Sequence, residues 1–204
     1  MSSLRLLLVR HGQTGSNVRG LLDSRPPGPP LTELGQRQAL ELADRLATRP
    51  VVAVYASIAV RAQQTAAPIA ARHGLPVSVT DGLHEVFVGE LENLNGPTDV
   101  ARFVEVYQAW HAGELERRMP GGESGRELLD RFLPVIDRIR AEHADGTVVL
   151  VSHSAALRLV GRTLGANVTG PFADTNFVRN CHAIELEPDG DGWRCLDWAG
   201  VPPA

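Results

Sequence analysis

The stretch "LLLVRHGQTGSN" (residues 6–17) places two basic side chains directly after a run of apolar residues. The apolar run over residues 4–9 has the length and residue types of a buried strand. Arg10, His11 and Gly12 follow at the point where that strand would end. A glycine commonly ends a strand, whereas an adjacent arginine and histidine are also suited to holding an anion. The rest of the chain must decide between these two interpretations.

Strand-like and helix-like segments alternate along the chain, which predicts an α/β fold. The remaining strand-like runs are residues 51–56, 76–79 and 147–152. Helical patterns cover residues 31–49, 57–74, 122–143 and 154–165. Two further runs joined by "PDGDG" (188–192) predict a C-terminal hairpin. We therefore expect a three-layer sandwich with a mainly parallel central sheet and an antiparallel edge strand.

Length and composition limit the classes of protein that the chain can be. Its 204 residues, 43% of them hydrophobic, fit one domain over residues 1–204, with a poorly patterned inserted excursion at about 86–121. The net charge of −4 argues against a nucleic-acid partner, and no apolar run is long enough to cross a membrane. Cys181 and Cys195 make no disulfide framework, and we expect them to face each other across the hairpin as thiols. A cytoplasmic protein is predicted.

Anion-binding residues follow three of the predicted strands. In a parallel sheet the carboxyl ends of the strands lie at one edge, where ligands bind. Because the chain contains no lysine, an anion site must be built from arginine and histidine. Each such residue alone is weak evidence, but their repetition at equivalent places predicts a phosphate pocket. The four residues concerned are Arg10, His11, Arg61 and His153.

Five motifs in order resemble the histidine phosphatase superfamily, the phosphoglycerate mutase-like enzymes of the branch 1 type. "LVRHGQT" (8–14) is similar to the Arg-His-Gly signature of that family, and "PLTELGQRQA" (30–39) to the segment after the first loop. The later matches are "SIAVRAQQTA" (57–66), "LHEVFVGELE" (83–92), and the pair "PGGES" (120–124) and "VSHS" (151–154). The resemblance covers nearly the whole chain.

The resemblance implies a role for individual residues. His11 is the expected nucleophile, which forms a phosphohistidine, and Glu85 the expected proton donor. Asn17 is expected to make an additional phosphate contact. The groups expected to hold the phosphoryl oxygens are Arg10, Arg61 and His153. The resemblance implies neither a metal nor another cofactor.

Elementary chemistry agrees with these roles. His11 must attack as a neutral imidazole, and neighbouring positive charge lowers the pKa of a histidine. Glu85 must give a proton to the leaving alkoxide and then act as a base on water. The sequence leaves Glu90 and Glu92 as alternatives to Glu85. Gly12 is expected to let the backbone pass close to the phosphate.

The resemblance implies a phosphomonoester hydrolase that acts on a small phosphorylated metabolite, which the sequence does not identify. We expect residues 18–30 and 86–121 to form the walls of its pocket. After His153, Ser154 and Ala155 stand where many relatives have glycine, which leaves less room for an anion. The candidate apolar contacts are Leu21, Leu22, Phe87, Phe103, Tyr107 and Trp110, and the candidate contacts to a second acidic group are Arg102, Arg117 and Arg118.

Two other functions remain as alternatives to a phosphatase. A phosphoglycerate mutase-type transfer shares the first half-reaction, although the short excursion at 86–121 favours hydrolysis. A non-catalytic phospho-ligand-binding module is the alternative from another class. The histidines show no metal-ligand spacing such as H-E-x-x-H, so a metal hydrolase is not expected. The oligomeric state is left open, with a homodimer as one candidate.

Overall fold

A six-stranded mixed sheet forms the centre of the molecule in the computed structural model, which describes residues 4–203. The strands lie in the order β3-β2-β4-β1-β5-β6. Four of them, β1 to β4, are parallel, and β5 and β6 form an antiparallel hairpin at one edge. The strand bounds are β1 Arg5–Arg10, β2 Val51–Ser57, β3 Val77–Thr80, β4 Thr147–Ser152, β5 Ala183–Asp189 and β6 Gly192–Trp198. The predicted fold class is confirmed.

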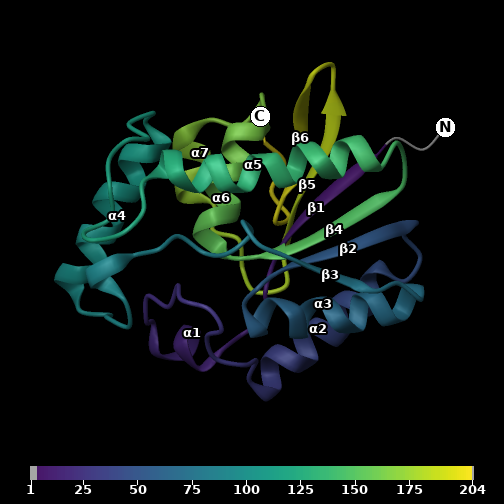
Figure 1. Cartoon of the computed structure of the whole chain (residues 1–204), viewed down its shortest axis with the longest axis horizontal. Helices are drawn as coiled ribbons and strands as arrows, with labels where there is room; N and C mark the ends of the chain where they lie inside the picture. Colours follow the sequence, from purple (N-terminus) through teal and green to yellow (C-terminus); the bar gives the residue numbers. More distant parts are fainter. Residues whose placement is uncertain (1–3, 204) are drawn as a thin grey trace.

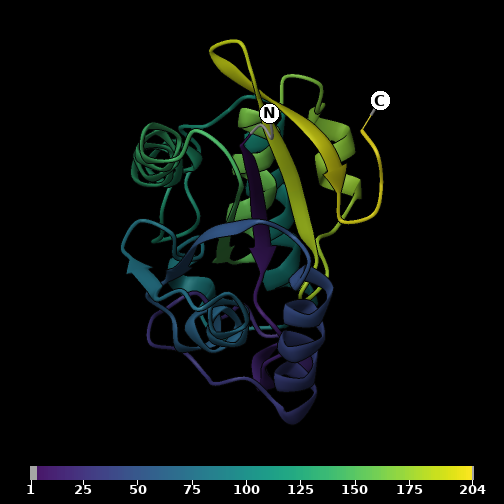
Figure 2. The ribbon, with the colours of Figure 1, turned by 90° about the vertical axis from the view of Figure 1, so that its right-hand side faces the viewer.

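Helices cover both faces of the sheet (Figure 1). Helices α2 and α3 lie on one face, and α5, α6 and α7 on the other. The helix bounds are α1 Gly15–Arg19, α2 Glu33–Leu46, α3 Val60–His73, α4 Pro97–His111, α5 Gly125–Glu142, α6 Ser154–Leu164 and α7 Gly170–Thr175, with a 3₁₀ turn, η1, at Gly89–Leu91. Figure 2 shows the same layers at right angles, with the strands between the helices.

The alternation of side chains along the central strands explains the two layers. Leu6 and Leu8 of β1 point into the core under α5 and α6, whereas Leu7 and Val9 point into the core under α2 and α3. β4 divides its residues between the two cores in the same way. A strand buried on both faces is apolar throughout, which is why residues 4–9 and 147–152 contain few polar positions.

The register brings the ends of β1, β2 and β4 together. Arg10 is paired with Ser152, and Ala56 with Val151, so the three strands end side by side. His11 and His153 directly follow the paired residues. The ends of these three strands therefore form the sheet edge that was predicted to carry the site.

The segment at 86–121 contains a helix that the sequence pattern did not reveal. Helix α4 buries Val106, Tyr107 and Trp110, which have helical spacing, but Val100 and Val104 are partly exposed and blur the pattern. The division into one domain with an inserted excursion stays a prediction. Helix α5 continues through Pro134, which is exposed.

The expectation for the cysteines is wrong. Cys195 lies in β6 opposite Leu186, whereas Cys181 precedes β5 and has a positive φ of 55°. Both are buried free thiols. Because β5 begins at Ala183, two residues after Cys181, the two cysteine side chains do not face each other across the hairpin. Among residues 4–203, the helices are all too short or too polar to cross a membrane.

Candidate active site

A cavity of about 250 Å³ lies at the carboxyl ends of β1, β2 and β4. Of the predicted site residues, Arg10, His11, Asn17, Arg61 and Glu85 line it. His153 lies just behind, with its ring centroid 5.1 Å from that of His11. The structure therefore brings all six predicted residues to one place, although they come from four separate parts of the chain.

His11 is held in one orientation at the end of β1. Its Nδ1 atom lies 2.7 Å from the carbonyl oxygen of Gly12. A carbonyl can only accept, so Nδ1 carries the proton and Nε2 keeps its lone pair. Burial is the main cause that lowers the pKa of His11 well below 6.5, and the Arg61 and Arg10 guanidiniums add to it. From the sequence we expected the pKa of His11 to be lowered by neighbouring positive charge, and the structure adds burial as the larger cause.

The two arginines that line the cavity are each only partly hydrogen-bonded, and Nη1 of Arg61 lies 3.7 Å from Oδ1 of Asp23 in a longer ion pair. Arg10 donates from Nη1 to the carbonyl of Val178 at 2.9 Å, and Arg61 from Nη2 to the carbonyl of Asp23 at 3.1 Å. Arg10 Nε and Arg61 Nη1 are buried and have no hydrogen-bond partner among residues 4–203. Buried donors are usually paired, so unpaired donors beside a cavity indicate where an acceptor binds.

His153 contributes a third unpaired group. Its Nε2 lies 2.8 Å from Ser57 Oγ at the end of β2, while Nδ1 is buried without a partner among the described residues. Burial, followed by the Arg61 and His11 charges, lowers the pKa of His153 well below 6.5. Ser57 is the first residue of the motif at 57–66, and the sequence did not predict a role for it in the site. Its position is explained by this contact with His153.

Glu85 faces the cavity from the segment after β3. Its carboxylate accepts hydrogen bonds from the backbone N–H groups of Val86 at 2.9 Å, Ala155 at 3.2 Å and Ala156 at 2.9 Å. The last two are at the N-terminus of α6, where N–H groups lack helical partners. The N–H groups after His153 thus face an oxygen acceptor despite the missing glycine, and in this structure the acceptor is the Glu85 carboxyl group.

The two alternative acids lie elsewhere. Glu90 is exposed and forms an ion pair with Arg102 at 3.5 Å. Glu92 binds the loop before the proline-rich stretch, where it accepts from the N–H and the hydroxyl of Ser24. Neither lines the cavity, so the geometry favours Glu85.

Backbone contacts fix the turn that carries His11. Thr65 of α3 accepts from the N–H of Gly12 at 3.0 Å, and Asn180 donates to the carbonyl of His11 at 2.8 Å. A Cβ atom at Gly12 would lie 2.6 Å from the carbonyl oxygen of Gly35. Gly12 is therefore required by the close approach of α2, which differs from the role expected for it.

The walls of the cavity come only in part from the predicted segments. Residues 21–24 and the side chains of Val88 and Phe103 line it as expected, whereas Tyr107 and Trp110 are buried in the core. The exposed candidates Arg102, Arg117 and Arg118 form ion pairs with Glu90, Glu105 and Glu127 outside the cavity.

Arg158 and Phe177 are wall residues that sequence reasoning missed. Arg158 of α6 is 4% exposed, and its guanidinium lies 4.3 Å from the ring centre of Phe177 and 5.0 Å from that of Tyr107. It donates to the carbonyls of Ala173 and Asp174 at 2.9 and 2.6 Å. Arg158 is four residues after Ser154, so the two side chains lie on the same side of α6. This spacing is the signal in the sequence that could have identified Arg158 as a wall residue.

Within residues 4–203, no group of three or more histidine, cysteine, aspartate or glutamate side chains is arranged to hold a metal ion. The cationic groups at the cavity are instead guanidiniums. Their charge and fixed fork of N–H groups suit a phosphoryl group with three outer oxygens.

Comparisons with known proteins agree with this geometry. The model of the histidine phosphatase superfamily (branch 1) matches residues 6–200. The chain is 33% identical over 218 residues to the PE-PGRS family protein PE_PGRS11 of Mycobacterium tuberculosis, covering 98% of this chain and 37% of that protein. It is 35% identical over 160 residues to the metal-independent phosphoserine phosphatase of Arabidopsis thaliana, covering 76% of this chain and 66% of that protein.

A solved structure is similar over the full length of both chains. The mycobacterial glucosyl-3-phosphoglycerate phosphatase in complex with VO3 superposes with a TM-score of 0.82 at 27% identity, covering 98% of this chain and 100% of the other. The resemblance predicted from the motifs is thus confirmed.

Proposed function

Because the chain belongs to the histidine phosphatase superfamily (branch 1), we propose that it hydrolyses small phosphorylated metabolites through a phosphohistidine formed on His11. The observation that carries the proposal is the oriented His11 ring beside three buried nitrogens that have no hydrogen-bond partner among residues 4–203. Phosphoryl transfer requires an in-line nucleophile and stabilisation of the charge on the outer oxygens. Two relatives are named as phosphatases, one of them metal-independent, which supports hydrolysis without a metal.

In the first step, the lone pair on Nε2 of His11 attacks phosphorus. The N–P bond forms while the bond between phosphorus and the leaving oxygen breaks. Arg10 and Arg61 donate to the outer phosphoryl oxygens with charges that are already in place, so little reorganisation is needed. The Ser57 hydroxyl lies 2.8 Å from Nε2 of His153. In the tautomer that the mechanism uses, this hydroxyl donates to Nε2, and the proton of the ring is on Nδ1 for a third oxygen.

Asn17 supplies a further contact. Its Oδ1 accepts from the N–H of Thr14 at 3.1 Å and from Nδ2 of Asn180 at 3.2 Å. Because the oxygen is occupied in this way, the Asn17 amide is fixed with its NH₂ group available to donate to a phosphoryl oxygen. Asn180 therefore orients Asn17 and the His11 backbone together.

Glu85 exchanges one proton in each half of the reaction. In the first half, the protonated carboxyl group gives its proton to the leaving oxygen, so that an alcohol departs. In the second half, the carboxylate takes a proton from water while the water oxygen attacks phosphorus and the N–P bond breaks. His11 and the protonated Glu85 are then restored, and inorganic phosphate leaves.

The proposal is tested by phosphate release in the presence of EDTA. The wild-type protein is expected to hydrolyse nitrophenyl phosphate and at least one alkyl phosphate from a panel of phosphorylated metabolites. His11→Ala is expected to lose turnover almost completely, whereas the control His73→Ala, at the far end of α3, is expected to keep it. Activity that EDTA abolishes and a divalent ion restores would overturn the metal-free mechanism. Transfer of the phosphoryl group to a second metabolite without its release to water would indicate a mutase.

A further inference from the structure

The segment that carries Glu85 has no regular secondary structure of its own. Residues 81–88 connect β3 to η1 without helical or strand hydrogen bonds. A general acid must nevertheless lie within hydrogen-bond reach of the leaving oxygen. Side chains from another part of the chain are therefore needed to hold this segment in place.

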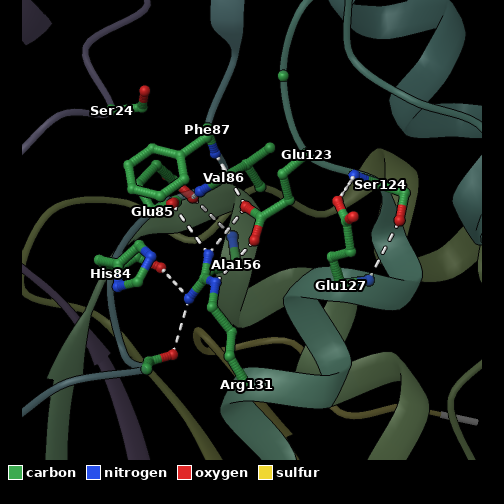
Figure 3. A network of polar contacts seen from close by, with 12 residues as sticks. Ser24, His84, Glu85, Val86, Phe87, Glu123, Ser124, Glu127, Arg131 and Ala156 are labelled. Carbon is green, nitrogen blue, oxygen red and sulfur yellow. Dashed lines mark hydrogen bonds and ion pairs between the residues drawn. The ribbon is translucent and has the colours of Figure 1, made fainter.

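Arg131 of α5 binds the backbone on one side of Glu85 (Figure 3). Its Nη1 donates to the carbonyls of Gly82 at 2.7 Å and His84 at 2.9 Å, and its Nη2 donates to the carbonyl of Glu85 itself at 3.0 Å. One guanidinium thus joins three carbonyls of the segment. Only arginine offers donors in several fixed directions, so this arrangement is specific to its side chain.

Glu123, in the "PGGES" motif, binds the other side of the segment. Its Oε2 accepts from the N–H of Phe87 at 2.9 Å, and its backbone N–H donates to the carbonyl of Phe87 at 2.9 Å. A Cβ atom at the neighbouring Gly122 would lie 2.2 Å from that same carbonyl. The motif therefore packs directly against the chain two residues after Glu85.

Arg131 and Glu123 are joined by a bidentate ion pair. Nε of Arg131 lies 2.7 Å from Oε1 of Glu123, and Nη2 lies 2.9 Å from Oε2. The Glu123 side chain is 8% exposed and that of Arg131 17% exposed. A buried pair with two parallel hydrogen bonds is rigid, because each charge would be left unpaired if the other moved.

We propose that the Arg131–Glu123 pair is the positioning device for the proton transfers of Glu85. The inference rests on the proposed function. The pair touches neither the cavity nor the other phosphate-binding residues, but it binds the backbone of residues 82, 84, 85 and 87. When the ion pair is lost, the Glu85 carboxyl group changes position, whereas the turn that carries His11 keeps its own hydrogen bonds.

The test compares two substrates that differ in their need for an acid. A nitrophenolate leaves without a proton, whereas the alkoxide of glycerol 2-phosphate does not. Arg131→Lys keeps the positive charge beside Glu123 but cannot reach three carbonyls. It is expected to slow phosphorylation of His11 by glycerol 2-phosphate by roughly 10- to 100-fold, part of what a general acid contributes. Phosphorylation by nitrophenyl phosphate, measured by rapid quench, is expected to change by less than about threefold.

Glu123→Gln provides a second variant that keeps an oxygen for the N–H of Phe87. It is expected to show the same selective loss, but a smaller one. In a Glu85→Gln background, Arg131→Lys is expected to add little, because residues that act through one another are not additive. Ile136→Val, a buried change on the same helix, is the control for lost stability and is expected to leave the ratio of the two substrates unchanged.

Three outcomes overturn the inference and leave the proposed function standing. They are equal losses on both substrates in Arg131→Lys, the full effect of Arg131→Lys persisting in the Glu85→Gln background, and a selective loss in Glu85→Gln without one in Arg131→Lys or Glu123→Gln. Failure of the proposed function has a different signature, namely no phosphate release by the wild-type protein or equal losses for both substrates in Glu85→Gln itself.

Discussion

The imidazole rings of His11 and His153 meet edge to face, with their planes inclined by 60°. They follow the ends of β1 and β4, which are paired in parallel register. Both rings are buried, and burial together with the Arg61 guanidinium lowers the pKa of each well below 6.5. Two neutral imidazoles therefore lie among the arginines, which supply the positive charge of the site. A neutral His11 keeps the lone pair on Nε2 that the proposed attack on phosphorus requires.

The first prediction concerns the ionisation of these two rings. Because the pKa of each is lowered, protonation requires a pH well below 6.5, and both rings stay neutral as the pH falls through 6.5. Carbon and nitrogen NMR shifts of the two imidazoles are expected to be unchanged between pH 8 and about 6, whereas in the urea-unfolded chain both histidines titrate near 6.5. A titration of His11 near 6.5 in the folded protein would contradict the account.

His111 is predicted to make the stability depend on pH. It is buried in α4 against Tyr107, and burial lowers its pKa to about 4. The unfolded chain therefore binds more protons than the folded one between pH 6.5 and 4, and stability falls as the pH is lowered through this range. The loss amounts to about 2 kcal/mol between pH 7 and pH 5. Urea unfolding of His111→Phe, which cannot titrate, is expected to lack this part of the loss, and identical pH dependence in both proteins would refute it.

Gly28 is predicted to be required for the position of Arg61. A Cβ atom there would lie 2.0 Å from Nη1 of Arg61. Gly28→Ala is expected to displace the guanidinium and to weaken vanadate binding by roughly 10- to 100-fold, the effect of losing one charge-assisted hydrogen bond. Gly74→Ala is a matched control, because its φ of +66° is the same but nothing lies within 4 Å. Equal vanadate affinity in the two variants would show that Arg61 does not depend on this contact.

Glu85→Gln is predicted to leave vanadate binding intact while it slows both proton transfers. Alkyl phosphates should lose about 10²–10⁴-fold in the phosphorylation of His11, and nitrophenyl phosphate much less. Removal of the phosphoryl group still needs a base, so phosphohistidine is expected to accumulate with the aryl substrate. Rapid-quench measurement of both half-reactions checks this. An unchanged phosphorylation rate with an alkyl phosphate would exclude Glu85 as the acid, and unchanged removal of the phosphoryl group after the nitrophenol burst would exclude it as the base.

The fold was predictable because its signals are local. Residues 4–9 and 147–152 are apolar except for Arg5, Thr147 and Ser152, as expected of strands buried on both faces. The ends of helices also carry local signals in the sequence. Thr32 accepts from the N–H of Gly35 at the start of α2, and Gly74 adopts the left-handed conformation at the end of α3. Helix α4 was missed because its partly exposed valines hide the amphipathic pattern.

The site was predictable where its residues follow the strands or belong to the quoted motifs. His11 and His153 are placed by the sheet itself, and their motifs mark them in the sequence. The contacts of Arg131 and Glu123 with residues 82–87 depend on how helix α5 and the loop before it pack against that segment, which no spacing along the chain reveals. The same holds for Gly12, whose lack of a side chain is explained by Gly35 on a different element.

The central claim is that Nε2 of His11 carries the phosphoryl group during turnover. The most direct measurement mixes Glu85→Gln with nitrophenyl phosphate, quenches the reaction in alkali on the millisecond timescale, and locates the added mass by peptide mass spectrometry. The account predicts one phosphoryl group on the peptide that contains His11, formed at the rate of the nitrophenol burst and absent in Glu85→Gln combined with His11→Ala. A nitrophenol burst with no phosphoryl group on His11, or with that group on another residue, would contradict it.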